Sequence, residues 1–586
     1  MTPLKTVFGI DLRALAVFRM GLGICLLLDL AGRARDLRDH YSDDGVLPRA
    51  DLSALGQSPT SLHMLSGETW FQAILFIAAA GAALALIIGL WTRLAMLLSW
   101  GLLASLVVRN KLLVQGGDNL LLLLLFWGLF LPLGARYSVD AAVNRTPPKS
   151  SMYWSMATTA LIVQLMAVYF FSALLKSGPE WIPNGTAIAY ALHLDYFVRP
   201  LGVWLREFPT LTQGATYHVW YLELLAPWLI ACPFWFKPLR WITLILLAGL
   251  HLGIAATMNV GLFFMISIVG LIVFVPASGW NWIQEKWDGP SRGGRGLTLY
   301  YDGNCEFCHK ACLILITFLR LQHARLLPAP SEGDVGKIMM IEQTWVVEDS
   351  GGGRHLKWDA LVFLSLRSPF NWLGRILGAG PFRRCGHTVY RFIASHRLQL
   401  GTITRVLCPY HSSTVTLGRE MNVTVGFLLL YVLYINIQGL PIAGPQWAHR
   451  FGLVRNLLSL SQRWDMFTPA PPKFDVWYAV RGELIDGRIV DVLRGTEGEP
   501  KMDPPFDVNA QYPTFRWEKY LSRLALASYQ PYRPAYANYL CRRWNDSHDP
   551  SSRLKRLWLN VITETNELDR QPTRQETLLV LIHTCP

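Results

Sequence analysis

The chain has few charged residues. Asp, Glu, Lys and Arg make up only 16% of its 586 residues, whereas 52% are hydrophobic. A typical soluble domain has about 25% charged residues, so this composition argues against a soluble enzyme and indicates a membrane protein. A chain of this length also predicts several structural units.

Basic runs with interleaved aromatic residues are absent, although the net charge is +13. In a membrane protein such an excess reflects topology and contact with anionic lipid, so we expect no nucleic-acid partner. The N-terminal segment has no small-residue cleavage site after its apolar run, and it carries Asp11 and Arg13. We therefore interpret that run as a retained first helix and not as a signal peptide.

A second cysteine pair at metal-binding spacing is also missing. Cys305 and Cys308 form a Cys-x-x-Cys motif, whereas Cys312, Cys385 and Cys408 stand alone. The absence of a second pair disfavours the interpretation of the motif as half of a zinc site, and we expect no bound metal ion. A redox pair is the favoured interpretation, and a degenerate, inactive motif is the alternative.

The surroundings of the motif favour redox chemistry. A β-rich run at 297–301 ends in a turn at Asp302-Gly303, and a helical pattern at 309–321 follows the cysteines. Two cysteines in the first turn of a helix after a strand are typical of thioredoxin-like folds. The helix N-terminus favours a thiolate, which makes Cys305 the nucleophile, and Cys308 can resolve a mixed disulfide. This chemistry requires no cofactor.

Nine apolar windows reach the length of a membrane span. They lie at about 14–30, 71–91, 94–109, 119–135, 157–176, 215–236, 240–256, 261–277 and 424–440. Eight precede the cysteine motif, which places it on the same side as the N-terminus. Residues 283–422 hold 17 Lys and Arg against 11 Asp and Glu. The positive-inside rule then favours a cytoplasmic N-terminus and redox unit with an external C-terminal unit, and we expect the plasma (inner) membrane. Cys541 and Cys585 could pair there or stay unpaired.

Polar residues inside the spans are candidates for function, because burying a charge in hydrocarbon is costly. Lys176, Glu223 and His251 are the main ones, with Arg19 near the first span. Each has a structural alternative: Lys176 can snorkel to the interface, His251 can be a hydrogen-bonded packing residue, and Arg19 can pair with Glu223. Trp181 lies in an irregular segment that we expect over the mouth of the bundle.

Several segments of this membrane block together resemble the HTTM family, which includes the vitamin K-dependent γ-glutamyl carboxylase. They are AVFR at 16–19, SVD at 138–140, YFFSALLKSGPEW at 169–181, the stretch from His251 to Gly261, and RWDMFTPAPP at 463–472. The resemblance implies that Lys176 is a base acting on a reduced quinone, supported by His251 and Glu223. Arg19, Asn119 and Trp181 are then candidate residues for binding a quinone-like molecule.

Two departures from that family bear on the reaction. Asn119 stands where the carboxylase carries a functional histidine, and Phe467-Thr468-Pro469 follows Met466 where a second histidine is expected. An asparagine can hydrogen-bond but cannot shuttle a proton alone. The resemblance therefore implies quinone or lipid binding more than glutamate carboxylation.

The cysteine motif resembles a second family. LYYDGNCEFC at 299–308 is similar to the DCC family of thiol-disulfide oxidoreductases, and the likeness extends over about 296–410, with a hairpin at 344–357. It implies a thioredoxin-like domain. Thioredoxins place a cis-proline before the third strand, and the segment 336–344 has no proline.

The predicted fold is multidomain: a polytopic α-helical membrane bundle of about nine spans, an inserted α/β thioredoxin-like domain and a small α+β C-terminal domain. The domain ranges are 1–282, 296–410, 423–441 for the last transmembrane helix, and 450–586. In the last range, Asp486-Gly487 predicts a hairpin, and amphipathic patterns predict helices at 513–546 and 570–582.

The predicted function is an integral membrane thiol-disulfide oxidoreductase of the protein-disulfide reductase type. Its partners are the lipid bilayer, a thiol or disulfide protein and a quinone-like molecule in the bundle. The alternative is a non-enzymatic lipid-binding scaffold with a redox-sensing module. A transporter is a third interpretation, but it would be supported by an inverted repeat, which the sequence does not display.

Overall fold

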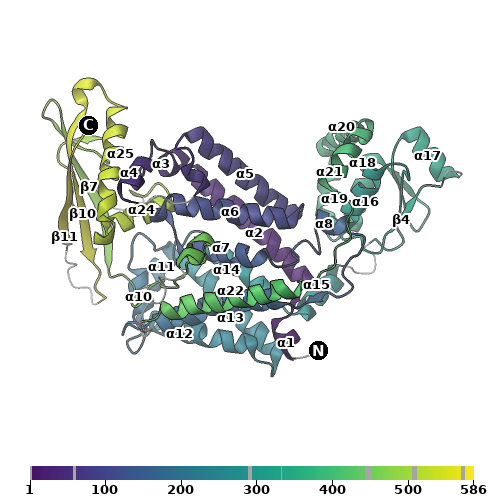
Figure 1. The fold of residues 1–586 in the computed structure, drawn as a ribbon, viewed down its shortest axis with the longest axis horizontal. Helices are drawn as coiled ribbons and strands as arrows, with labels where there is room; N and C mark the ends of the chain where they lie inside the picture. Colours follow the sequence, from purple (N-terminus) through teal and green to yellow (C-terminus); the bar gives the residue numbers. More distant parts are fainter. Residues whose placement is uncertain are drawn as a thin grey trace.

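The computed structural model describes residues 3–56, 61–287, 294–330, 333–441, 452–504, 508, 511–568 and 575–586. A helical bundle forms its middle. A sheet with two helices, which we call the C-terminal unit, lies at one end, and the segment with the cysteine motif, the redox unit, lies at the other (Figure 1).

Each of the nine apolar windows forms a helix in the bundle. These helices are α2 (Leu12–Ala34), α5 (Thr69–Ile88), α6 (Thr92–Arg109), α7 (Gly116–Gly128), α9 (Met156–Leu175), α12 (Pro209–Ala231), α13 (Phe236–Thr257), α14 (Phe263–Leu271) and α22 (Arg419–Gln438). In the part of the chain that the structure describes, six helices have the length and apolar composition of a membrane span: α2, α5, α6, α9, α13 and α22. A seventh is reached if α14, η3 (Ile272–Phe274) and α15 (Ala277–Trp287), bent by 95°, count as one. Nine spans therefore stay a prediction.

Helix α7 lies in the core of the bundle. It has 13 residues, and its six leucines from Leu120 to Leu125 are all buried. A helix with this pattern has no face for water or lipid. Helix α5 differs, since it leaves Ile74 and Ile77 exposed at 52% and 71%, as expected for a lipid-facing surface.

Short elements complete the two ends of the bundle. They are α1 (Pro3–Phe8), β1 (Ile10–Asp11) paired with β2 (Met152–Tyr153), α3 (Leu37–Tyr41), α4 (Arg49–Ala54), η1 (Leu62–Met64), η2 (Lys111–Leu113), α8 (Val139–Ala142), α10 (Ala187–Leu192) and α11 (Pro200–Leu205). In Figure 1 the N-terminus, α8, α15 and the redox unit share one end, and the C-terminal unit lies at the other. This arrangement agrees with the even helix count before the cysteine motif.

The redox unit is built on a four-stranded sheet of order β4-β3-β5-β6. Strands β3 (Thr298–Tyr301) and β4 (Arg325–Pro328) are parallel and are joined by α16 (Glu306–Phe318). The predicted hairpin at 344–357 is confirmed as β5 (Val346–Glu348) and β6 (Arg354–Leu356), which are antiparallel. The other helices are α17 (Asp334–Glu342), α18 (Lys357–Arg367), α19 (Asn371–Gly378), α20 (Gly380–Ser395) and α21 (Arg397–Leu407).

The C-terminal unit is a five-stranded sheet of order β11-β10-β7-β8-β9. Its elements are β7 (Phe474–Leu484), β8 (Ile489–Asp491), β9 (Thr496–Glu497), α24 (Phe515–Ala525), η6 (Ala527–Tyr532), α25 (Arg533–Asn545), η7 (Pro550–Ser552), β10 (Leu554–Thr565) and β11 (Gln575–Thr584); α23 (Gly452–Leu457) precedes them. Strands β7 and β8 form the predicted hairpin, and Gly487 at its turn has a φ of 88°, a value that glycine adopts without strain.

The prediction of a helix at 570–582 was wrong. Residues 569–574 lie outside the described residues, and from Gln575 the chain forms β11, which pairs antiparallel with β10. The run from Leu578 to Ile582 is continuously apolar, so its periodicity does not separate a buried strand from a helix. Pairing with the twelve-residue strand β10 decides in favour of the strand.

Candidate functional site

The two motif cysteines lie where α16 begins. Cys305 is the N-cap residue, and its Sγ accepts a hydrogen bond from the backbone N–H of Cys308, with a sulfur–nitrogen distance of 3.2 Å. The two residues form a disulfide with their Cα atoms 5.2 Å apart. Because the first N–H groups of a helix carry partial positive charge, this position stabilises a thiolate on Cys305 once the disulfide opens.

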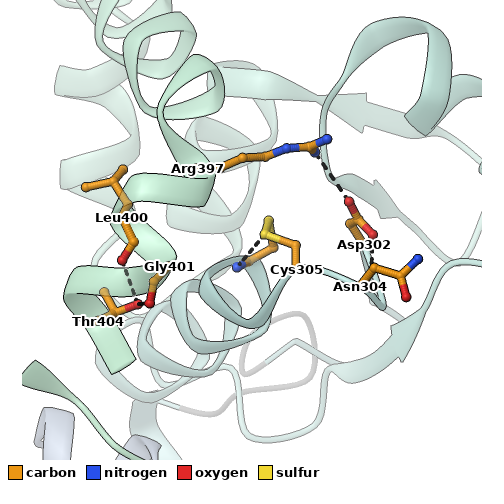
Figure 2. Close-up of a disulfide and its surroundings, with 8 residues drawn as sticks. Asp302, Asn304, Cys305, Arg397, Leu400, Gly401 and Thr404 are labelled. Atoms are coloured by element: carbon orange, nitrogen blue, oxygen red, sulfur yellow. Dashed lines mark hydrogen bonds and ion pairs between the residues drawn. A yellow bond between two sulfur atoms is a disulfide. The ribbon is translucent and has the colours of Figure 1, made fainter. Parts of the chain in front are cut away.

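An ion pair stands next to this disulfide. Arg397 of α21 reaches across to Asp302 at 3.4 Å, and Figure 2 shows the pair beside Cys305, with Leu400, Gly401 and Thr404 of α21 on the other side. Cys305 is only 8% exposed in this arrangement. Helix α21 therefore restricts access to the sulfur of Cys305 and brings a guanidinium near it.

A buried cation lies one turn further along α16. Lys310 is 1% exposed, and its Nζ contacts Glu306 at 2.7 Å and the carbonyl oxygen of Thr404 at 3.1 Å. The hydrogen bond from Lys310 lowers the pKa of Glu306. The neighbouring His309 bonds the hydroxyl of Tyr410 through Nδ1 at 2.6 Å, and burial lowers its pKa. The start of α16 is thus tied to α21 through Lys310 and to Tyr410 through His309.

An apolar cavity of about 400 Å³ opens beside Cys308. Its walls include Ile314, Leu315, Met339, Trp345, Trp358, Leu361 and Ile393. Two other cysteines, Cys312 and Cys408, also line it, and burial raises the pKa of Cys312 to about 12 and that of Cys408 above its usual value. Neutral buried thiols react slowly, so we do not expect Cys312 or Cys408 to take part in disulfide exchange.

A second polar group lies in the bundle, where α9 ends. Lys176 forms an ion pair with Glu223 of α12, and its Nζ stands 4.7 Å from the ring centroid of Trp181. All three side chains are buried. The indole N–H of Trp181 donates to the carbonyl oxygen of Phe467 at 3.0 Å, so the segment after α22 covers this group. The structure thus brings together Lys176, Glu223 and Trp181.

His251 has a different set of partners. Its Nε2 lies 2.8 Å from the hydroxyl oxygen of Tyr169, and its ring packs edge-on against Phe263. Among the described residues its Nδ1 has no hydrogen-bond partner. Tyr169 lies two turns before Lys176 on α9, which joins His251 to the same helix as the ion pair.

Comparison with known proteins bears on this membrane block. Residues 9–280 match the HTTM domain. The match supports the HTTM part of the resemblance and suggests a vitamin K carboxylase-like membrane family. No curated protein and no solved structure matches the chain.

Two of the predicted binding residues lie in other parts of the HTTM domain. Arg19 is fully buried and donates to the carbonyl oxygens of Leu86 at 3.0 Å and Tyr137 at 2.7 Å. It therefore ties helix ends together, and the partner of Glu223 is Lys176. Asn119 lines a cavity of about 370 Å³ whose walls also include Tyr434, Gln438 and Gln462. Among the described residues, no three His, Cys, Asp or Glu side chains could hold a metal ion.

Sequence reasoning missed one charged cluster. Asp29, Arg33 and Asp118 of the HTTM domain meet Arg516 of α24, and all four side chains are buried. Arg33 contacts both carboxylates at 2.7 Å. Asp29 lies in one apolar window and Asp118 directly before another, which was a signal for a buried partner, but the sequence does not place Arg516 beside them.

Proposed function

We propose that the chain is an integral membrane thiol-disulfide oxidoreductase of the protein-disulfide reductase type. The observation that carries this proposal is the placement of Cys305 as N-cap of α16, bonded to the N–H of Cys308 and joined to it by a disulfide. A helix start that stabilises a thiolate, with a second sulfur one turn away, is what disulfide exchange requires.

The sheet around the pair supports a thioredoxin-like unit. A parallel β3–α16–β4 element followed by an antiparallel hairpin on the other side of β3 gives the order β4-β3-β5-β6, and the pair lies where β3 leads into α16. This is the placement expected for a redox motif at a strand-to-helix turn. The described cis peptide bonds, at Pro183 and Pro469, lie outside this unit.

The exchange is a two-electron transfer. In the reduced enzyme, the Cys305 thiolate attacks one sulfur of a protein disulfide, forms a mixed disulfide and releases the other sulfur as a thiolate. The Cys308 thiolate then attacks the sulfur of Cys305, releases the second substrate thiolate and closes the Cys305–Cys308 disulfide. The substrate gains two electrons and two protons, and a second dithiol must reduce the pair again.

The test uses full-length protein in detergent with a disulfide-bonded peptide as substrate and dithiothreitol as reductant. Cys305→Ser should slow reduction to the rate of dithiothreitol alone, and pre-reduced Cys308→Ser, freed of dithiothreitol before the peptide is added, should accumulate the mixed disulfide, which mass spectrometry detects. Cys385→Ser is the matched control, since Cys385 is a free, exposed cysteine of the same unit. Full activity of Cys305→Ser would overturn the proposal.

For the bundle, we infer a site for a quinone-like molecule or a lipid near Lys176, which acts as a base. The support is the buried group of Lys176, Glu223 and Trp181 within the region that matches the HTTM domain. A quinone found by mass spectrometry in the purified protein supports this chemistry, and bulk phospholipid alone supports the lipid-binding scaffold.

For the topology, we propose nine crossings, with the redox unit in the cytoplasm and the C-terminal unit outside the plasma (inner) membrane. The nine helices of the bundle and the opposite placement of the two units in Figure 1 support it. An impermeant thiol reagent applied to intact cells should leave Cys385 unlabelled and should label it after the membrane is opened. Labelling of intact cells would reverse the orientation.

A further inference from the structure

The redox unit has an exposed surface on α19, α20 and α21 that combines apolar and basic side chains. From residue 360 to residue 419 the chain has eight arginines and no Asp, Glu or Lys. The large apolar residues exposed on these three helices are Trp372, Ile376, Phe382, Val389, Phe392, Ile393, Leu398, Ile403, Val406 and Leu407. We call this surface the α19–α21 face. Its composition is that of an interfacial membrane helix, in which apolar residues enter the lipid and basic residues meet the headgroups.

Helix α20 separates these two kinds of residue. Phe382, Cys385, Val389 and Phe392 follow one another at intervals of three or four residues, so they form one stripe along the helix. All four are exposed, with Phe392 at 62%. Gly386, which borders this stripe, is buried, and an added Cβ there would meet the ring of Trp358 at 2.0 Å. The helix thus packs through Gly386 and leaves the apolar stripe exposed, with Phe392 stacked on His396, the C-cap of the same helix, at 4.3 Å between ring centroids.

The arginines of this surface divide into two groups. Arg383, Arg397 and Arg405 form ion pairs with Asp359, Asp302 and Glu306. Arg375, Arg384 and Arg391 are exposed and, among the described residues, form no ion pair. Three unpaired guanidinium groups beside an apolar stripe fit anionic phosphate headgroups, because arginine binds phosphate with a forked pair of donors.

The position of the redox unit brings this surface near the membrane boundary. Helix α15 leads from the bundle into the unit and α22 follows it, so the chain is tied to the bundle at both ends. The backbone N–H of Arg145, in the segment between α7 and α9, also donates to the carbonyl oxygen of His411 at 2.9 Å. In Figure 1, α20 and α21 stand beyond the ends of α5 and α6, on the side of the unit nearer the bundle.

We propose that the α19–α21 face lies on the surface of an anionic lipid leaflet, with the apolar stripe of α20 in the interface and the unpaired arginines on lipid phosphates. Ile393, Arg397 and Thr404 on these helices also line the cavity beside Cys308. Docking therefore places one wall of that cavity against the lipid surface, so access to the redox pair depends on the lipid.

The experiment measures the depth of α20 in nanodiscs containing full-length protein. Cys232 and Cys408 are replaced by serine, and Cys385 is labelled with a nitrobenzoxadiazole fluorophore without reductant, so that both disulfides stay closed. Quenching by spin-labelled phospholipid should be about twofold stronger in phosphatidylglycerol-containing discs than in pure phosphatidylcholine discs, because anionic headgroups attract the arginines. Arg384→Gln combined with Arg391→Gln should remove that difference.

The control label is placed on α17, away from the bundle in Figure 1. Ile341→Cys, in a background with Cys385→Ser, carries the label at a position that is 79% exposed, and it should be unquenched in both discs. Equal quenching of the Cys385 label in the two lipids would overturn the proposal. So would a blue-shifted, unquenched label, which would indicate a second copy of the chain on this face.

Discussion

Arg516 of the C-terminal unit donates two parallel hydrogen bonds to Asp118, which lies 398 residues earlier at the start of α7. The nitrogen–oxygen distances are 2.6 Å and 2.8 Å, and Arg516 also donates to Asp29 at 2.6 Å and to the carbonyl oxygen of Leu113 at 2.7 Å. With Arg33 included, two guanidinium groups balance two carboxylates away from water. Because an unpaired buried charge costs several kcal/mol, the four charges depend on one another.

Replacing Arg516 by methionine should destabilise the contact between the C-terminal unit and the bundle. The change leaves two buried carboxylates with one guanidinium, and we expect a loss of about 3–5 kcal/mol, measured by thermal unfolding of the full chain in detergent. Arg523→Met is the matched control on α24, because within the described ranges Arg523 donates to the carbonyl oxygens of Lys111 and Leu112 and to no carboxylate. Equal losses in the two variants would contradict the charge-balance argument.

This cluster also shows which contacts the sequence could predict and which it could not. Cys305 was predictable because its strand, turn and helix are adjacent in the chain, and the structure places it as an N-cap as expected. Asp29 and Asp118 were visible as acids in or beside apolar windows, but their partner Arg516 lies in an amphipathic helix of another unit. The spacing of apolar residues indicates only local structure. It therefore does not predict a contact between residues that are 398 positions apart.

Separating the ion pair in the bundle gives a second prediction. Lys176→Met leaves the Glu223 carboxylate buried without its cation, and we expect a loss of about 3–5 kcal/mol in unfolding free energy. Adding Glu223→Gln removes the unpaired charge, so the double variant should recover most of that loss. Thermal unfolding of both variants measures the coupling. If the double variant is no more stable than Lys176→Met, the pair is not what holds α9 to α12 at this point.

Asp475 predicts a pH dependence of stability. It is 2% exposed, accepts the N–H of Asp195 at 2.9 Å and a bond from Asn566 at 2.8 Å, and burial raises its pKa to about 7. Because the folded pKa lies above the unfolded value, the stabilisation is complete below about pH 4 and is lost as the pH rises through 7. Between pH 6 and pH 8, ionisation of Asp475 should lower the free energy of unfolding by about 1 kcal/mol.

The pH dependence is measured as the unfolding midpoint of the wild type and of Asp475→Asn between pH 6 and pH 8. The asparagine cannot ionise, so the unfolding midpoint of the variant should fall less steeply with pH than that of the wild type. Equal slopes in both proteins would show that another group titrates in this range.

The disulfide between Cys541 and Cys585 gives the last prediction. From the sequence, these two residues could be paired or unpaired. The structure joins them by a disulfide with a Cα–Cα distance of 5.6 Å across 44 positions of the chain. Cys541 is fully buried on α25, and Cys585 follows β11, so the bond fixes the edge strand to the helix that packs on the sheet. Cross-linking a loop of this length stabilises a fold by about 2–4 kcal/mol.

Replacing both cysteines by alanine should therefore lower the free energy of unfolding by that amount, and dithiothreitol should then have little further effect on the unfolding midpoint. In the wild type the reductant also opens Cys305–Cys308, which closes a loop of only three positions and contributes far less chain entropy. A large effect of reductant on the alanine variant would assign the redox-sensitive stability to the Cys305–Cys308 pair, and so to the redox unit instead of the C-terminal unit.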